Sequence, residues 1–323
     1  MRNLTCFTLL ITAAVAVASS AVGQSYPVKS IRMIIGFPPG GGTDIIGRIV
    51  AQRLGDGLKQ QIVPDNRGGA SGQIAAEIVA KEPPDGYTVM MAHTAAMSIL
   101  PSLYPGLAYD PVRDFAPISL VAISPQLVVS HPSLPVKSIK ELIALAKGRP
   151  NQIHFASVGN GSVQHLAGEM FNLQAGVKMV HVPYKGGGPA VIDLVGGHVQ
   201  ISFDVIPVVL GHIKAGKLRA IAVTSANRTR LLPDVPTVNE SGLSGFDLST
   251  WWGLVAPAAV RKEIIARLHD ETTKALKVSD VRERIAANGA DPVGNSPEEF
   301  ASFIRSERAK YAQIVKDAKV KLD

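Results

Sequence analysis

The sequence is nearly free of cysteine: its one cysteine, Cys6, lies in an N-terminal segment typical of a secretion signal. Residues 1–24 place Arg2 ahead of a short apolar stretch, and Ala21-Val22-Gly23 puts small residues where signal peptidases cut, so we expect cleavage before Gln24. The mature chain then has no thiol, which excludes disulfides, thiolate metal ligands and a cysteine nucleophile. Its stability must come from a core, which a 46% hydrophobic composition can supply, most simply as two domains.

Aromatic residues are scarce as well, at 5%, and the net charge of +7 is spread along the chain. A nucleic-acid surface needs a basic stripe with stacking rings, so we expect no nucleic-acid partner. Beyond the leader no apolar run approaches the ~18 residues of a membrane-spanning helix. These features predict an exported, periplasmic protein whose mild basic excess suits the collection of small anions.

Catalytic motifs are also missing. Gly69-Ala70-Ser71-Gly72-Gln73 lacks the last glycine of a nucleophile elbow, and no H-E-x-x-H occurs. The eight histidines show no metal-ligand spacing, so we expect neither a metal nor a cofactor. A serine hydrolase that uses Ser162 or Ser71 with a histidine remains an alternative, although no complete set of nucleophile, base and orienting residue can be assembled.

What the sequence does contain is a glycine-rich turn near its mature start. An apolar strand ends at Gly36, and Phe37-Pro38-Pro39-Gly40-Gly41-Gly42-Thr43-Asp44 follows, with Thr43 or Asp44 as the expected cap of the next helix. Such a turn can aim bare backbone N–H groups at an anion. It is neither a Walker A motif nor a G-x-G-x-x-G fingerprint, which favours a carboxylate over a nucleotide. A plain strand-to-helix turn is the competing interpretation.

Strands alternate with helices of 10–15 residues along the chain, which predicts α/β architecture with parallel sheets. Glycine or a Ser/Thr cap occupies the strand-to-helix loops at 37–44, 66–71, 92–94, 157–162 and 184–189. In open α/β sheets such loops converge on the ligand. Long apolar strands at about 119–130, interrupted by Pro125, and at about 248–256 are spaced as crossings between domains. We therefore predict residues 26–124 plus 248–323 as domain 1 and residues 125–247 as domain 2.

Several side chains near these loops have two interpretations each. Ser162 and His165 share a helix turn and can face a site together, or Ser162 simply caps the helix. Lys185, beside Tyr184 and three glycines, can neutralise a carboxylate or stay solvated. Asp204 follows an apolar strand and can accept a ligand amine or a water, or cap the next helix. The Trp251-Trp252 pair can line a pocket or belong to the core.

Six motifs in order carry a family resemblance over essentially the whole mature chain. They are the turn 37–44, Pro84-Asp85-Gly86-Tyr87-Thr88, Tyr109-Asp110-Pro111-Val112-Arg113-Asp114-Phe115-Ala116-Pro117-Ile118, Val182-Pro183-Tyr184-Lys185-Gly186-Gly187-Gly188-Pro189-Ala190, Gly216-Lys217-Leu218-Arg219-Ala220 and Leu232-Pro233-Asp234-Val235-Pro236-Thr237. In this order the chain resembles the substrate-binding receptors of tripartite tricarboxylate transporters, also called Bug proteins.

The resemblance implies a type II periplasmic binding fold of two domains, each a mostly parallel sheet flanked by helices, with the ligand cleft between them. It implies a monomeric receptor that closes on a small organic carboxylate and delivers it to the membrane subunits of the transporter. A receptor that signals to a sensor is the alternative within this class. The implied ligand-binding residues are Phe37, Gly40, Gly41, Thr43, Asp44, His93, Thr94, Ala95, Ser157, Gly159, Gly161, Ser162, His165, Tyr184, Lys185 and Asp204.

The chain departs from the family pattern at three places. Met97-Ser98-Ile99-Leu100-Pro101 replaces a more polar run, His93 stands where a small polar residue is expected, and Arg67-Gly68-Gly69 lacks the usual proline. We expect the first two departures to border the pocket, so they bear on which ligand is bound.

Overall fold

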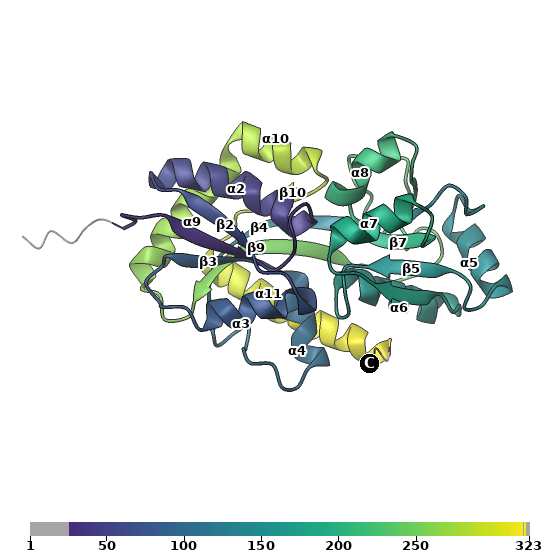
Figure 1. Ribbon diagram of the computed structural model, residues 1–323, viewed down its shortest axis with the longest axis horizontal. Helices are drawn as coiled ribbons and strands as arrows, with labels where there is room; N and C mark the ends of the chain where they lie inside the picture. The colour runs from purple at the N-terminus through teal and green to yellow at the C-terminus, as the bar shows by residue number, and fades with distance from the viewer. Residues whose placement is uncertain (1–25, 319, 321–323) are drawn as a thin grey trace, which may run out of the picture.

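The protein is described by a computed structural model, which places residues 26–318 and 320. The predicted signal segment, its cleavage site and Cys6 lie outside these described residues. Figure 1 shows an elongated molecule in which two groups of strands and helices lie side by side along the long axis.

Ten strands occur within the described residues, and eight of them follow one path in the order β2-β1-β3-β9-β4-β7-β5-β6, while β8 and β10 pair with β4. Their bounds are β1 Ile31–Ile35, β2 Ile62–Asn66, β3 Thr88–His93, β4 Phe115–Ser130, β5 His154–Ser157, β6 Val180–Pro183, β7 Ile201–Val205, β8 Arg219–Val223, β9 Ser249–Pro257 and β10 Asp291–Pro292.

Strand β4 belongs to two sheets. From Phe115 to Pro125 it pairs with β9, and from Gln126 to Ser130 it pairs with β7. We call β1, β2, β3, β9, β10 and the first part of β4 the first sheet, and β5 to β8 with the rest of β4 the second sheet. The strand runs through Pro125 instead of breaking there, because this residue stands where the pairing partner changes. The predicted domain boundaries at 124/125 and 247/248 stay a prediction.

The sheets are more mixed than the mostly parallel sheets expected from the sequence. The pairs β1–β2, β1–β3, β5–β6 and β5–β7 are parallel, and each antiparallel pair involves β4 or β9. The physical reason is that β4 and β9 cross between the two regions, so they do not follow the strand–helix–strand connections that give parallel neighbours.

Helices cover both faces of each sheet (Figure 1). Around the first sheet, α2 and α10 lie on one face and α3, α4 and α11 on the other, and α7 and α8 face α5 and α6 across the second sheet. Their bounds are α2 Gly42–Leu58, α3 Gln73–Ala80, α4 Leu100–Leu103, α5 Ile139–Gly148, α6 Val163–Ala175, α7 Gly187–Val195, α8 Ile206–Lys214, α9 Lys262–Lys277, α10 Ser279–Ala287 and α11 Pro297–Asp317, with a 3-10 turn at Ala70–Gly72 and a π turn at Ala95–Ile99.

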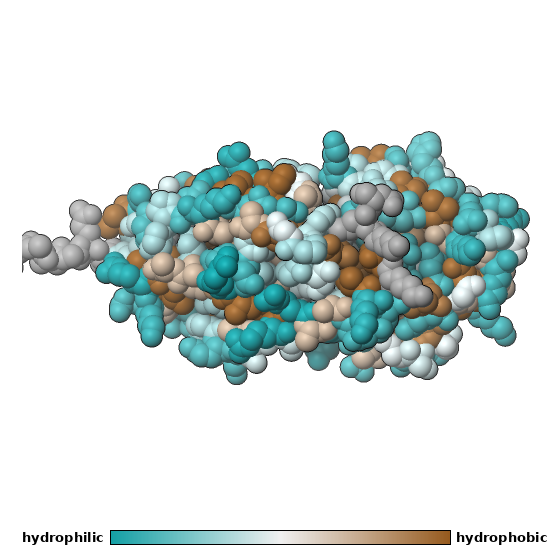
Figure 2. Space-filling model, turned by 90° about the horizontal axis from the view of Figure 1, so that it is seen from below, coloured by the Kyte–Doolittle hydropathy of each residue, from teal (hydrophilic) through white to brown (hydrophobic). Residues whose placement is uncertain are grey.

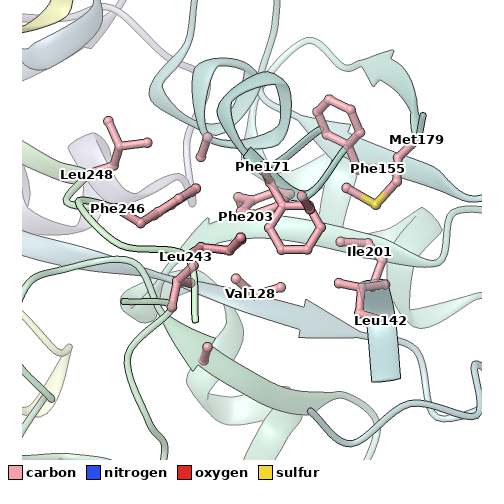
Figure 3. Packing of buried hydrophobic residues seen from close by; sticks show 14 of the residues in the cluster. Val128, Leu142, Phe155, Phe171, Met179, Ile201, Phe203, Leu243, Phe246 and Leu248 are labelled. Carbon is pink, nitrogen blue, oxygen red and sulfur yellow. The ribbon is translucent and has the colours of Figure 1, made fainter. Parts of the chain in front are cut away.

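Buried apolar side chains fill both faces of the two sheets. In the second sheet Phe203 packs between Phe155 and Phe171, at ring-centroid distances of 6.0 and 5.8 Å (Figure 3). The end of α11 reaches the same cluster through Tyr311 and Val315. Helix α11 therefore packs against both regions of the molecule.

The surface is mainly hydrophilic on the face drawn in Figure 2, where hydrophobic residues form small separate groups. Within the described ranges, none of the helices combines the length and the apolar character that crossing a membrane requires.

Candidate functional site

A cavity of about 40 Å³ lies between the two sheets, and we call it the inner cavity. One buried water needs roughly 10–15 Å³ of such volume, so the inner cavity has room for a few water molecules in this conformation. A small-molecule ligand therefore requires the two walls of the cavity to lie further apart. Its lining comes from both sides: Phe37, Gly41, Gly42, Thr43, His93, Ala95, Thr250 and Trp252 from the first sheet, and Val158, Ser162, Val163, Gln164, Gly187, Asp204, Val205 and Val208 from the second.

Four helices begin at this cavity. Lining residues lie in the N-cap or first turn of α2 (Gly41, Gly42, Thr43), α6 (Ser162, Val163, Gln164), α7 (Gly187) and α8 (Val205, Val208). The first N–H groups of a helix have no acceptor within it, and the helix dipole puts partial positive charge there. The N-cap of α2 is Gly41, with no side-chain cap, so the expected cap by Thr43 or Asp44 is wrong.

Apolar and hydroxyl side chains complete the wall. Trp252 lines the cavity while only 1% exposed, and its Nε1 donates to Thr43 Oγ1 at 3.0 Å. Because that oxygen accepts from the indole, the hydroxyl hydrogen of Thr43 remains to be donated elsewhere. Trp251 points to the other face of β9 and packs against Phe300, so the tryptophan pair serves both the pocket and the core.

His93 ends β3 beside the cavity. Its ring packs on Phe37 at a centroid distance of 4.8 Å, and the residue is 2% exposed. Burial lowers the pKa of His93 to about 3, so the imidazole is neutral at physiological pH. Its Nε2 is a buried atom without a hydrogen-bond partner.

Asp204, in β7, is the acidic residue of the lining, and it is 1% exposed. Burial raises the pKa of Asp204 to about 6, against the opposing effect of hydrogen bonds from Val205 N and from Gln164. The Val205 N to Asp204 Oδ1 distance is 2.8 Å. Neither lysine nor arginine occurs among the described residues that line the inner cavity.

A second, larger cavity opens beside the first, and we call it the outer cleft. Its volume is about 770 Å³, and it shares Phe37 and Val158 with the inner cavity. Besides Phe37, three of the predicted binding residues line it, namely Gly159, Tyr184 and Lys185. Tyr184 donates its hydroxyl to Asp193 at 2.7 Å, and Lys185 is exposed.

The outer cleft is bridged by one hydrogen bond between its two walls. Ser71 Oγ donates to the carbonyl oxygen of Asn160 at 2.7 Å. Pro38 and Gly186 meet close by, since a Cβ on Gly186 would lie 2.9 Å from Pro38 Cδ. The conformation described is therefore a closed one.

Three predicted residues on the first-sheet side do not line either cavity. Asp44 Oδ2 accepts from Gly40 N at 3.0 Å, and Asp44 Oδ1 accepts from Arg48 and Asn66 at 2.8 and 2.9 Å. These contacts lower the pKa of Asp44 despite its burial. Thr94 Oγ1 accepts from Trp251 N at 2.8 Å. Gly40, Asp44 and Thr94 thus hold the loops around the cavity in place.

Three predicted residues on the second-sheet side also line neither cavity, and they support the wall from behind: Ser157, Gly161 and His165. Ser157 Oγ lies 2.6 Å from His181 Nε2, and the His181 ring stacks on His165 at 4.0 Å. Burial, and then the neighbouring His165, lower the pKa of His181 to about 3. Gly161 N donates to His165 Nδ1 at 3.2 Å, and Ser162 Oγ caps α6 by accepting from His165 N.

The remaining seven predicted residues, Phe37, Gly41, Thr43, His93, Ala95, Ser162 and Asp204, do line the inner cavity. Sequence reasoning missed Gly42, Val158, Val163, Gln164, Gly187, Val205, Val208 and Thr250. Helix position was an available signal for Gln164, which lies two residues after the cap Ser162. The departure at Met97 does not reach the pocket, because Met97 is buried in the core of the first sheet.

No group of three or more histidine, cysteine, aspartate or glutamate side chains with the geometry of a metal site occurs among residues 26–318 and 320. Apart from Asp204 and His93, the described lining has no titratable side chain. The arrangement presents the starts of four helices to an anion between largely apolar walls.

The family model described as "Tripartite tricarboxylate transporter family receptor" matches residues 46–320. Protein BugT of Bordetella pertussis is 39% identical over 307 residues, which cover 95% of this chain and 94% of BugT.

Two solved structures resemble the whole fold. R. palustris Rpa4515, solved with adipate, has a TM-score of 0.89 at 34% identity and covers 92% of this chain and 99% of its own. MatC (Rpa3494) from Rhodopseudomonas palustris, solved with bound malate, has a TM-score of 0.86 at 32% identity. The match covers 90% of this chain and 100% of the MatC chain.

Proposed function

This chain belongs to the family of tripartite tricarboxylate transporter receptors, and from that premise we propose that its inner cavity binds a small organic carboxylate when the cleft closes. We further propose that the protein works in the periplasm as a monomer and delivers this ligand to the membrane subunits of a tripartite transporter.

The convergence of four helix N-termini on one cavity without lysine or arginine is the observation that supports the ligand class most strongly. Backbone amides at helix starts favour a compact anion such as a carboxylate. A hydrogen bond to a charged group contributes about 1.5–3 kcal/mol, so several of them reach the ~8 kcal/mol of a micromolar complex.

The similar proteins support the same class, because Rpa4515 was solved with adipate and MatC with malate. Both walls of the inner cavity contribute lining residues, so a bound anion would hold the two sheets together. A membrane partner can then distinguish the closed from the open shape.

The two serines of the hydrolase alternative are engaged in structural hydrogen bonds. Ser162 Oγ accepts from the backbone of His165, as an N-cap does, and Ser71 Oγ donates to Asn160. We therefore propose that the protein binds its ligand without converting it.

The proposal is tested with the secreted chain, purified free of ligand, in a thermal-shift screen of mono-, di- and tricarboxylates followed by calorimetry. A ligand that binds only the folded state raises the melting temperature. Thr43→Val should weaken the best acid by about 10–100-fold, because it removes a hydroxyl donor to a charged group. Thr273→Val, on α9 and outside both cavities, is the matched control and should leave affinity unchanged.

The outcomes separate the candidate functions. Binding without turnover supports the receptor, whereas ester hydrolysis that Ser162→Ala abolishes would replace it with the hydrolase. Folded protein that binds no acid would reject the carboxylate. Loss of ligand uptake in a deletion strain supports transport, and unchanged uptake favours a signalling role. Light scattering of the purified chain tests the monomer.

A further inference from the structure

Asp204 gives the inner cavity an unusual electrostatic composition for an anion site. Asp204 lines the cavity and is 1% exposed, so its carboxylate is shielded from bulk solvent. A second anion placed against it would meet a like charge in a medium of low dielectric. The part of the ligand next to Asp204 must therefore differ from the part at the helix N-termini.

The protein satisfies only part of the hydrogen-bonding capacity of Asp204. Val205 N donates to Oδ1, and Gln164 provides a second donor. An ionised carboxylate accepts about four hydrogen bonds. His93, the other titratable residue of the described lining, is neutral because burial lowers its pKa to about 3. Acceptor positions of Asp204 are thus left for a group that enters the cavity.

The start of α2 and the end of β7, which carries Asp204, lie on opposite walls of the cavity. Gly42, at the start of α2, faces Val205, the neighbour of Asp204, closely enough that a Cβ on Gly42 would lie 2.9 Å from Val205 Cγ2. The walls that carry α2 and Asp204 are thus in contact here, and a ligand that touches both must hold them slightly further apart.

We propose that the ligand is a carboxylic acid that carries a second, hydrogen-bond-donating group, either an ammonium or a hydroxyl, and that Asp204 binds this donor. The inference rests on the proposed function, since it names the ligand class of the same cavity. The acid group lies at the helix N-termini, the donor contacts Asp204, and the hydrocarbon between them packs on Trp252 and Val208.

Acids that share one carbon skeleton test the proposal on the unmodified protein. Calorimetry compares succinate, malate and aspartate, and in parallel glutarate, 2-hydroxyglutarate and glutamate. In whichever series fits the cavity, the hydroxyl or amino member should bind at least 10-fold more tightly than the plain acid, by the measured ratio of dissociation constants. Preference for the amino member identifies an ammonium, and preference for the hydroxyl member identifies an alcohol.

Asp204→Asn should then reduce that preference to less than threefold, because the charge that attracts the donor is gone. Asp193→Asn is the matched control, since Asp193 bonds Tyr184 and does not line the inner cavity. Its ligand preference should equal that of the unmodified protein.

Three results would overturn the inference. Equal binding of the plain, hydroxyl and amino acids rejects the donor while the carboxylate receptor stands. An unchanged preference in folded Asp204→Asn rejects the role of this residue. Absence of binding by every acid in both series and by adipate rejects the carboxylate receptor and the donor together.

Discussion

Asp44 and Asp204 are buried carboxylates near the starts of helices on opposite sides of the inner cavity. Asp44 is 4% exposed and accepts from Gly40, Arg48 and Asn66, so its charge is satisfied by the protein. Asp204 is 1% exposed and has no cationic partner in the described lining. The pKa of Asp44 is lowered, whereas the pKa of Asp204 is raised to about 6.

This difference distinguishes a carboxylate whose acceptors the protein satisfies from one whose acceptors it leaves partly free, and their sequence context does not reveal it. A buried carboxylate with a full set of donors contributes to stability, and one with missing donors costs stability until something else supplies them. The cost is tolerated at Asp204 because that side chain lines the cavity.

The largest expected effect comes from removing the satisfied carboxylate. Asp44→Ala leaves the Gly40 N–H and the Asn66 amide without their acceptor, and it should lower the free energy of unfolding by about 3 kcal/mol in urea denaturation. Asp56→Ala on the same helix breaks only an exposed pair with Arg53 and should cost at most about 0.5 kcal/mol. Equal costs for the two variants would remove the distinction between the sites.

The next largest effect is on the pH dependence of stability, which should have opposite signs for Asp204 and Asp44. Because the folded pKa of Asp204 is about 6, against 3.8 for an unperturbed aspartate, its contribution to stability is present below pH 3.8 and is lost as pH rises through 6. The unfolding free energy of the unmodified protein relative to Asp204→Asn should therefore fall by up to about 3 kcal/mol across that window.

Asp44 should show the reverse sign against Asp44→Asn, since a lowered folded pKa gives stability above pH 3.8 that is lost on acidification. His93 and His181, whose pKa values are lowered to about 3, also destabilise the fold below pH 6.5, but they cancel in these differences. Parallel slopes for the two aspartates would contradict the comparison.

A smaller effect, on ligand affinity, is expected where Gly42 on one wall of the inner cavity packs against Val205 on the other. Gly42→Ala places a methyl group 2.9 Å from Val205 Cγ2 and 3.0 Å from Trp252 Cζ2, so it should oppose closure and weaken ligand binding by at least about 10-fold in calorimetry. Gly188→Ala is the matched control in the first turn of α7, where a Cβ meets nothing within 4 Å. Comparable affinity in both variants would show that the contact does not limit closure.

The smallest effect is expected at the outer cleft. Ser71→Ala removes the hydrogen bond to Asn160 that joins its walls, worth about 0.5–1.5 kcal/mol, and should speed ligand dissociation by about 2–10-fold in stopped flow. Ser306→Ala, which removes a hydroxyl bonded within α11, should leave dissociation unchanged. A dissociation rate unaltered by Ser71→Ala would mean that this bond does not hold the cleft closed.

Much of the architecture followed from the sequence, because glycine loops, alternating elements and six ordered motifs each constrain it. The family resemblance and the fold class are confirmed. The antiparallel pairing of β4 and β9 did not follow, since strand direction across the sheet depends on partners more than 100 residues apart. The passage of β4 through Pro125 was missed for the same reason.

The site was predictable at the level of loops but not of single side chains. Asp44 and Asp204 have similar local sequence, and Asn66, which engages Asp44, comes from a different strand. The Arg48 contact was a signal within reach, because residues four apart on a helix are neighbours. Lys185 was expected at the ligand and lies at the outer cleft, since the position of its loop depends on packing between the two sheets.

Because β4 belongs to both sheets, the two sheets should unfold together. Its sixteen residues form hydrogen-bond ladders on both sides of Pro125, and α11 packs against both regions. If either sheet unfolds, β4 is disturbed and the other sheet loses hydrogen bonds to it. Heat should therefore unfold the protein in one calorimetric transition. A receptor whose two sheets share a strand is in this respect a single cooperative unit.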